Sequence, residues 1–240
     1  MGYCSSDAWV GNVGANYNAV GWPFRGQRIL EATLATLVAN FSLGVATVGA
    51  PRMLLAGGYD AGARGAMYWA DYVPALLPAG TQLRALFDGP LWMSIEPLNP
   101  ETPPLLNQTL AAVYLQNSTG RAGPACVANY NGVDLYRCFF GALRLPLVRT
   151  QYMVSAPQFD PYQLSYEIGA PPPYGGTQLA YANIFQRNMR SLVMTLPAAQ
   201  QGGSMVFSSA CYTHGSTLSE EFGAVRVDGS ISLKDYLNDW

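Results

Sequence analysis

The sequence has few charged side chains: Asp, Glu, Lys and Arg make up 12% of its 240 residues, against about 25% in an ordinary soluble domain. Its net charge is −2 and its 13 basic residues are scattered singly. It therefore lacks the basic patch expected of a protein that binds nucleic acid or an anionic membrane surface. No run of about 18 apolar residues is present, so no transmembrane segment is expected. Met1 is followed neither by basic residues nor by an apolar stretch, so no signal peptide is visible in the chain.

The four cysteines lack the paired C-x₂-C spacing of a zinc site, and neither a metal nor a cofactor is expected. Cys126 and Cys138 flank a short polar segment, which favours a local disulfide between them. Cys4 and Cys211 are solitary. Three glycosylation sequons are present, at Asn40, Asn107 and Asn117. Because chance alone gives about one or two in a chain of this length, they are a first hint of export.

Hydrophobic periodicity predicts helices over 24–41 and 61–73, and short apolar runs predict strands over 52–56 and 83–87. This strand–turn–helix–strand order is a βαβ unit, which favours a parallel sheet. The pattern then predicts a helix over 105–115, a strand over 147–154, a helix over 178–196 and a strand over 204–208. No linker or repeat divides the chain. Residues 1–240 are therefore expected to form a single α/β domain with a mostly parallel central sheet flanked by helices.

The segment Gly58-Tyr59-Asp60-Ala61-Gly62 lies between a predicted strand and a predicted helix. This is the context of a G-x-S-x-G nucleophile elbow, in which a strained central residue is lifted from the sheet and needs small neighbours. Here the central residue is Asp60 instead of serine. The pattern alone is equally compatible with an ordinary glycine-rich turn that carries a solvated aspartate.

Two further residues favour the elbow. His214 is the only histidine in the sequence and follows the last predicted strand, where an α/β-hydrolase carries its base. Asp160 follows the preceding strand, where the orienting acid belongs. A lone histidine is more often structural than catalytic, but the order Asp60, Asp160, His214 is the nucleophile–acid–histidine order of this fold. The sequence thus predicts an α/β-hydrolase-like domain.

Seven short segments extend the match along the chain. They are Tyr3-Cys4-Ser5-Ser6-Asp7-Ala8-Trp9, Phe24-Arg25-Gly26-Gln27-Arg28-Ile29, Leu54-Leu55 with Gly58-Tyr59-Asp60-Ala61-Gly62, Leu86-Phe87-Asp88-Gly89, Cys138-Phe139-Phe140, Phe159-Asp160-Pro161-Tyr162-Gln163-Leu164 and Ser209-Ala210-Cys211-Tyr212-Thr213-His214. In this order they resemble the pectin acetylesterase and Notum family of extracellular carboxylesterases.

The resemblance implies a role for each candidate site residue. Asp60 stands at the nucleophile position, Asp160 is the triad acid and His214 the base, while Asp88 is the fallback acid. The backbone N–H of Ala61 is an oxyanion donor. The implied activity is hydrolysis of O-acyl esters on an acylated polysaccharide or a lipid-modified protein, outside the cell or in the secretory pathway.

Two departures from the family pattern stand against that activity. Asp60 replaces the nucleophilic serine, and loss of the serine in such triads costs orders of magnitude in rate. Two carboxylates beside one imidazole also tend to keep His214 protonated, which prevents it from acting as a base. In addition, the family's strands upstream of the Tyr-Cys motif are missing here. We therefore expect the sheet to lack its N-terminal strands and to have an uncovered edge; either the chain is a fragment, or a protein partner covers that edge.

Three hypotheses follow. The chain is a family member that has lost catalysis and binds a glycan or acylated ligand, with assembly into a larger complex as a related non-enzymatic role. Alternatively, it is a carboxylesterase whose serine is absent only in this chain. In the third hypothesis, Asp60 is itself a nucleophile that attacks sp³ carbon, as in haloalkane dehalogenases and epoxide hydrolases.

Overall fold

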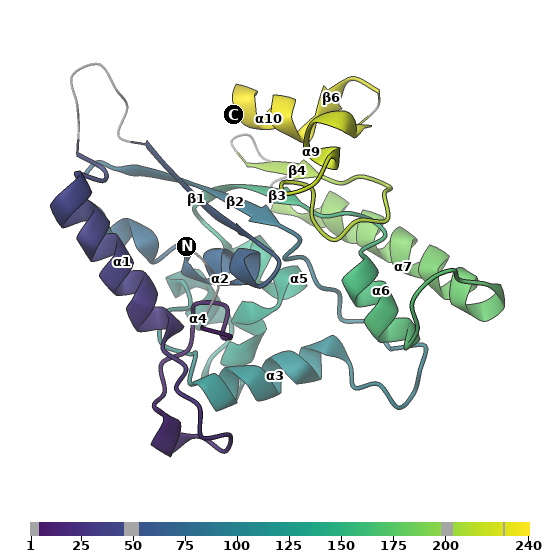
Figure 1. The fold of residues 1–240 in the computed structure, drawn as a ribbon, viewed down its shortest axis with the longest axis horizontal. Helices are drawn as coiled ribbons and strands as arrows, with labels where there is room; N and C mark the ends of the chain where they lie inside the picture. Colours follow the sequence, from purple (N-terminus) through teal and green to yellow (C-terminus); the bar gives the residue numbers. More distant parts are fainter. Residues whose placement is uncertain (1–4, 46–52, 198–203, 228) are drawn as a thin grey trace.

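The computed structural model describes residues 5–45, 53–197, 204–227 and 229–240. Its centre is a four-stranded sheet of β1 (Met53–Tyr59), β2 (Gln82–Asp88), β3 (Gln151–Ser155) and β4 (Met205–Phe207). The strands lie side by side in chain order, and every neighbouring pair is parallel (Figure 1). The α/β fold with a parallel sheet is thus confirmed.

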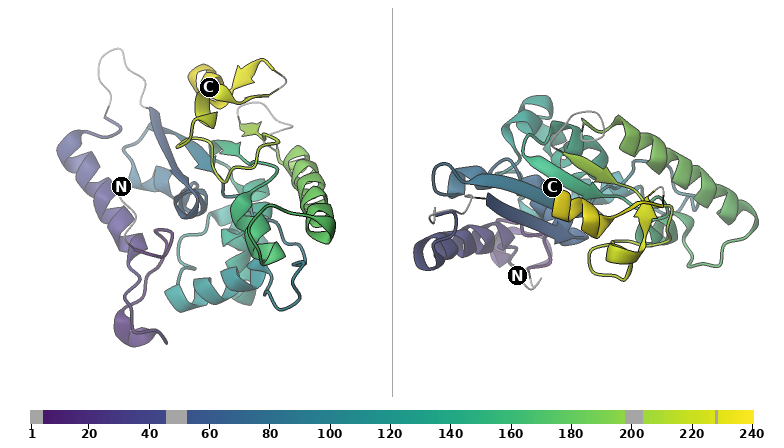
Figure 2. Two further views of the ribbon diagram at one scale, coloured as in Figure 1. Left: turned by 45° about the vertical axis from the view of Figure 1, so that its right-hand side comes forward. Right: turned by 90° about the horizontal axis from the view of Figure 1, so that it is seen from above.

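The helices connect and cover these strands. They are α1 (Gly26–Phe41), α2 (Ala61–Trp69), α3 (Leu105–Gln116), α4 (Pro124–Asn129), α5 (Gly141–Arg144), α6 (Pro161–Ile168), α7 (Gly176–Thr195), α9 (Glu221–Ala224) and α10 (Leu233–Asp239). Short 3₁₀ turns are η1 (Ala15–Tyr17), η2 (Val73–Leu76), η3 (Gly132–Phe139) and η4 (Leu145–Leu147). A small antiparallel pair, β5 (Arg226–Val227) and β6 (Ile231–Ser232), precedes α10. Figure 2 shows α1 and α7 at opposite ends of the sheet.

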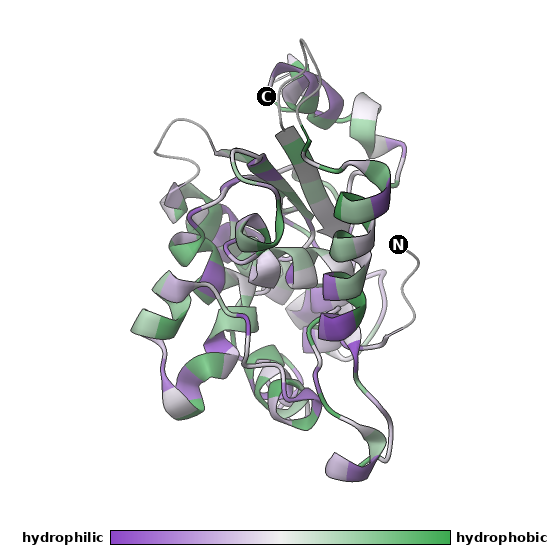
Figure 3. Ribbon diagram, turned by 90° about the vertical axis from the view of Figure 1, so that its left-hand side faces the viewer, coloured by the Kyte–Doolittle hydropathy of each residue, from purple (hydrophilic) through white to green (hydrophobic). Residues whose placement is uncertain are grey.

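Alternation along the strands sends side chains to two cores. Phe87 of β2 and Val154 of β3 pack with apolar residues of α2, α6 and α7. Met153, the neighbour of Val154, points to the other face and packs with Phe207 and Leu233, as the two-residue period of a strand requires. The outer helices carry both hydrophilic and hydrophobic residues along their length (Figure 3), the composition of helices that are buried on one side.

Most of the predicted elements are confirmed. The helices expected over 24–41, 105–115 and 178–196 correspond to α1, α3 and α7, and the strands over 83–87 and 204–208 to β2 and β4. The strand expected over 52–56 corresponds to β1, which continues through Gly57 and Gly58 to Tyr59; residue 52 lies outside the described residues.

Two boundaries were wrong. The helix expected over 61–73 ends at Trp69 and gives way to the 3₁₀ turn η2, which contains Pro74, and a proline restricts the residue before it. The strand expected over 147–154 begins only at Gln151, because Leu145 to Leu147, with Pro146 among them, form the turn η4. Helix α6, which begins directly after Asp160, was not predicted.

The predicted disulfide between Cys126 and Cys138 is present and buried. Cys211 is not in a disulfide with any described residue, and Cys4 lies outside the described residues. The sequon asparagines Asn40, Asn107 and Asn117 are all exposed. In the described parts of the chain, no helix combines the length and apolar composition needed to span a bilayer.

The carboxyl ends of the strands meet at one edge of the sheet. Tyr59, Asp88 and Ser155 are in register as the last residues of β1, β2 and β3. Side chains that follow them along the chain therefore come together at this edge, which is where open α/β sheets place their ligands. At the side of the sheet, β1 pairs with β2 only, among the strands that the structure describes.

Candidate functional site

Asp60 occupies a strained turn between β1 and α2. Its backbone has φ 51° and ψ −120°, and a positive φ is uncommon for any residue but glycine. A Cβ at position 58 would come within 2.3 Å of the Gly62 backbone, whereas a Cβ at Gly62 would meet nothing within 4 Å. The turn therefore depends on Gly58 and tolerates a larger residue at position 62. Both the strain and the need for a small residue before the turn are properties of a nucleophile elbow.

His214 lies between Asp60 and Asp160. Its Nδ1 is 2.9 Å from Oδ2 of Asp160, in a hydrogen bond. Its Nε2 is 2.9 Å from Oδ1 of Asp60, an ion-pair distance without the alignment of a hydrogen bond. The structure thus brings together three residues that lie far apart along the chain; the two nearest in sequence, Asp160 and His214, are 54 positions apart. Their contacts have the arrangement of a catalytic triad.

The two carboxylate oxygens of Asp160 bind different groups. It is the N-cap of α6, where Oδ1 accepts the Gln163 N–H at 3.0 Å, and Oδ2 holds the histidine. The side chain of Gln163 then ties α6 to the loop after β2, because it accepts the Met93 N–H at 2.9 Å and donates to the Leu91 carbonyl at 3.1 Å. Asp followed by Pro is a helix-start signal that could have revealed α6; the long-range role of Gln163 has no sequence signal.

The Asp88 side chain does not bind the His214 imidazole. Its buried carboxylate accepts the backbone N–H groups of Ser216 and Thr217, at 3.0 and 2.7 Å, and the Thr217 hydroxyl at 2.6 Å. Nδ1 of His214 is held by Asp160 instead. The fallback acid of the sequence, at the end of β2, therefore binds the segment that follows the histidine and not the imidazole.

This geometry can be compared with known proteins. The family described as pectinacetylesterase matches residues 1–240. The chain belongs to the pectinacetylesterase family. The resemblance inferred from the sequence motifs is thus confirmed, and with it the assignment to a family of carboxylesterases.

Solved structures give the same fold. Two crystal forms of Notum from Drosophila, described as a Wnt deacylase, superpose with TM-scores of 0.83 and 0.84 at 24% sequence identity. The alignments cover 99% and 98% of this chain but only 64% and 65% of Notum. This pectinacetylesterase-family chain therefore has the Notum fold over nearly all of its length and spans less than two thirds of the Notum chain. The comparison with curated proteins found no match to this chain.

The two carboxylates control the protonation of His214. Burial acts to lower the pKa of His214, but the hydrogen bond to Asp160 and the charges of Asp160 and Asp60 outweigh burial and raise the pKa to about 10. For Asp60, partial burial acts to raise the pKa, while His214, the Ala61 N–H and Arg64 lower it below the usual value. At neutral pH the pair is therefore an imidazolium beside a carboxylate.

Aromatic rings enclose the imidazole. The Tyr59 ring lies edge-on to His214 with centroids 5.5 Å apart, and the Tyr162 ring lies 5.6 Å away on a tilt. Trp92 stacks on Tyr162, and the Arg64 guanidinium lies 3.9 Å over the Trp92 ring. The rings restrict access of water to His214, which strengthens its interaction with both carboxylates. In the described parts of the chain, no three His, Cys, Asp or Glu side chains are grouped to hold a metal ion.

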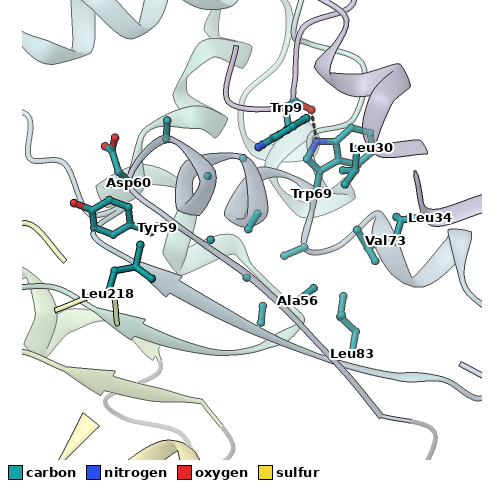
Figure 4. A pocket seen from close by; sticks show the side chains of 18 residues that line it. Trp9, Leu30, Leu34, Ala56, Tyr59, Asp60, Trp69, Val73, Leu83 and Leu218 are labelled. Atoms are coloured by element: carbon teal, nitrogen blue, oxygen red, sulfur yellow. Dashed lines mark hydrogen bonds between the residues drawn. The ribbon is translucent and has the colours of Figure 1, made fainter. Parts of the chain in front are cut away.

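A cavity of about 500 Å³ reaches the elbow from the side of β1. Figure 4 shows Tyr59 and Asp60 at one end of it and Leu34, Val73 and Leu83 at the other. Trp69, whose Nε1 donates to the Trp9 carbonyl at 2.9 Å, forms part of the wall. Among the described residues that line the cavity, Asp60 is the one acidic or basic residue, and 41% of its side chain is exposed. The site therefore joins an apolar space to a single carboxylate.

Proposed function

We propose that this chain is a member of the pectinacetylesterase family that has lost ester hydrolysis and binds an acylated ligand. The observation that carries the proposal is the position of His214 between Asp60 and Asp160. A serine esterase needs a neutral imidazole that takes the hydroxyl proton. Here the imidazole has a pKa of about 10 and is protonated at neutral pH. Its neighbour at the elbow has no hydroxyl proton to give.

The elbow carboxylate is also a poor substitute for the serine. Attack of a carboxylate on an ester carbonyl would give a mixed anhydride, and a carboxylate is a weak nucleophile toward that centre. Base and nucleophile are thus both impaired by one substitution.

The cavity beside the elbow supports the binding role. Its apolar lining favours an acyl group over a bare sugar, and an acyl chain along it would bring its ester group to Asp60. The family name refers to acetylated pectin and Notum is a Wnt deacylase, so both kinds of relative act on acyl groups. We propose an acylated polysaccharide or a lipid-modified protein as the ligand. Its acyl group would lie in the cavity.

Hydrolysis of p-nitrophenyl acetate and p-nitrophenyl octanoate tests the loss of catalysis. The wild-type chain should hydrolyse both at the same rate as His214→Ala. Wild-type hydrolysis that disappears in His214→Ala would refute the proposal. Asp60→Ser separates this proposal from the hypothesis of an esterase that lacks only its serine, since a gain of several orders of magnitude would favour the latter.

Binding is tested by titration with an octanoylated peptide, read through tryptophan fluorescence because Trp9 and Trp69 line the cavity. Ala56→Phe places a large ring in the cavity and should weaken binding about tenfold or more. Ala180→Phe is the matched control, because Ala180 is an exposed residue of α7 outside the cavity. Equal affinities for the two variants would rule out the cavity as the binding site.

A second candidate function is hydrolysis by an aspartyl-ester mechanism. It is favoured by the exposure of Asp60 and its contact with His214. Once Asp60 is esterified its charge is lost, and the pKa of His214 would fall toward a value suited to a base. Incubation with a haloalkane and epoxide panel in ¹⁸O-labelled water should label Asp60 if this chemistry operates. An unlabelled Asp60 and an unreacted panel would eliminate it.

We further propose that the chain passes through the secretory pathway. The disulfide between Cys126 and Cys138 is of the kind found in exported proteins, and Asn40, Asn107 and Asn117 are exposed. When the chain is expressed behind a secretion signal, treatment with an N-glycosidase should lower its mass. Replacement of all three asparagines by glutamine should abolish this shift. An unchanged mass in the wild-type chain would contradict the proposal.

A further inference from the structure

Asp88 contacts both the elbow and the segment that carries His214. Its backbone carbonyl accepts the N–H of Asp60 at 2.9 Å. Its side chain accepts the N–H groups of Ser216 and Thr217 and the Thr217 hydroxyl. One residue at the end of β2 therefore connects the elbow, through its main chain, to the loop of the histidine, through its carboxylate.

The histidine loop is confined around this connection. A Cβ at Gly215 would lie 2.1 Å from the Tyr59 ring and 3.1 Å from Oδ2 of Asp88. A Cβ at Gly89 would lie 2.6 Å from the His214 carbonyl oxygen. These distances leave no room for the loop to approach the sheet further. The loop can move only away from it, and the hydrogen bonds to Asp88 oppose that movement.

A second bond strengthens the attachment. The Ser216 hydroxyl lies 3.3 Å from the hydroxyl of Ser155, the residue of β3 that is in register with Asp88. Asp88, Ser155 and Ser216 are all fully buried, so water cannot replace these interactions without opening the loop. The Asp88 carboxylate accepts three of these four hydrogen bonds.

We infer that Asp88 is a positioning residue that fixes the histidine loop to the elbow and thereby keeps His214 between Asp60 and Asp160. It acts through the backbone of Ser216 and Thr217 and does not itself contact the imidazole. The inference concerns the same histidine as the proposed function. It rests on the proposed function, because that function makes the position of His214 important. It does not require the site to be catalytic or inactive.

The protonation of His214 reports its position. The charged and titratable groups described around the imidazole are Asp60, Asp160, Tyr59 and Tyr162, with Arg64 beside Asp60 and the Asp88 carboxylate behind the histidine loop. If the loop moves away from the sheet, the contacts with both aspartates lengthen and the pKa of His214 falls toward the value of a free histidine, about 6.5. Since His214 is the only histidine in the chain, its NMR signals are unambiguous.

The experiment is an NMR titration of the His214 ring signals in the full chain and three variants. Asp88→Asn should lower the pKa by about one unit or more. Thr217→Val, which removes one hydroxyl donor, should lower it by a smaller amount, and Thr217→Ser, which keeps the hydroxyl, should leave it unchanged. A wild-type pKa in folded Asp88→Asn would overturn the inference.

The threonine pair also covers a failure of Asp88→Asn to fold, which circular dichroism would detect. In that case a pKa in Thr217→Val equal to that in the wild-type chain overturns the inference, and a shift rescued in Thr217→Ser supports it. Thr217→Val keeps the Asp88 charge, so a shift cannot arise from loss of that charge. Ester hydrolysis by the wild-type chain would refute the proposed function without altering these results.

Discussion

Two clusters of charged groups, one around Asp71 and one around His214, pair their carboxylates with different kinds of cation. Asp71 pairs with Arg144 at 2.9 Å and accepts further hydrogen bonds from the backbone of Arg149 and Thr150. Arginine has a fixed positive charge in proteins, so Asp71 has a cationic partner whose charge does not vary. At the elbow, Asp60 and Asp160 share a histidine whose positive charge depends on pH. The two clusters therefore differ in whether the cation can lose its charge.

The largest expected effect comes from breaking the Asp71 cluster. Asp71→Asn keeps the size of the side chain but leaves the buried Arg144 charge uncompensated. We expect a loss of about 3–5 kcal/mol in the free energy of unfolding, measured by urea denaturation at pH 7. A loss below about 1 kcal/mol would mean that the pair behaves like one on the surface.

The His214 cluster should make stability depend on pH. The pKa of His214 is raised to about 10 in the folded chain, against about 6.5 in an unfolded one. Its contribution is thus fully present below pH 6.5 and is lost as the pH rises toward 10. After allowance for the exposure of Asp60, we expect a loss on the order of 2 kcal/mol.

His214→Gln is the control for this window. Urea denaturation at several pH values should give a flatter profile for His214→Gln than for the wild-type chain between pH 6.5 and 10. The Asp71 cluster contributes equally to both proteins, so it does not affect the difference. Parallel profiles would show that His214 is not held as an imidazolium.

Asp60→Ser sharpens the comparison at the elbow itself. It removes one of the two carboxylates that raise the pKa of His214, so the pKa should fall by about one unit or more. The ring titration followed by NMR measures the change directly. An unchanged pKa in a folded Asp60→Ser chain would assign the whole effect to Asp160.

The smallest effect is expected for an exposed pair. Arg137 and Asp134 lie 3.0 Å apart with about a third and half of their side chains exposed, and water screens such charges. Asp134→Asn should change the free energy of unfolding by only about 0–1 kcal/mol, in the same urea assay as Asp71→Asn. An effect as large as that of Asp71→Asn would remove burial as the explanation for the difference between the clusters.

Local patterns in the sequence were enough for much of the fold. Period-3.6 spacing of apolar residues placed α1, α3 and α7, short apolar runs placed β2 and β4, and the βαβ order implied a parallel sheet. The boundaries failed where prolines and buried polar contacts intervene: α2 ends before Pro74, and β3 starts late after the turn that contains Pro146. Helix α6 was missed because it is short and its start signal, Asp160 followed by a proline, lay in a segment interpreted as a loop.

The candidate site divides in the same way. Asp60, Asp160 and His214 were chosen from their order along the chain and their places after predicted strands, which is information that a sequence contains. The role of Asp88 could not be predicted in this way, because its partners Ser216 and Thr217 are 128 and 129 residues away. The sequence offered it only as a fallback acid.

The sequence by itself determined the family, the parallel α/β fold and the presence of Asp60 between Gly58 and Gly62 after a strand, since these are properties of residue identity and order. Only the tertiary structure decided which carboxylate holds which nitrogen of His214. It also decided that Asp88 supports the histidine loop instead of the imidazole. The reason is physical: whether a carboxylate orients, charges or merely anchors a histidine depends on distances of about 3 Å, and chain folding alone sets such distances between residues far apart in the sequence.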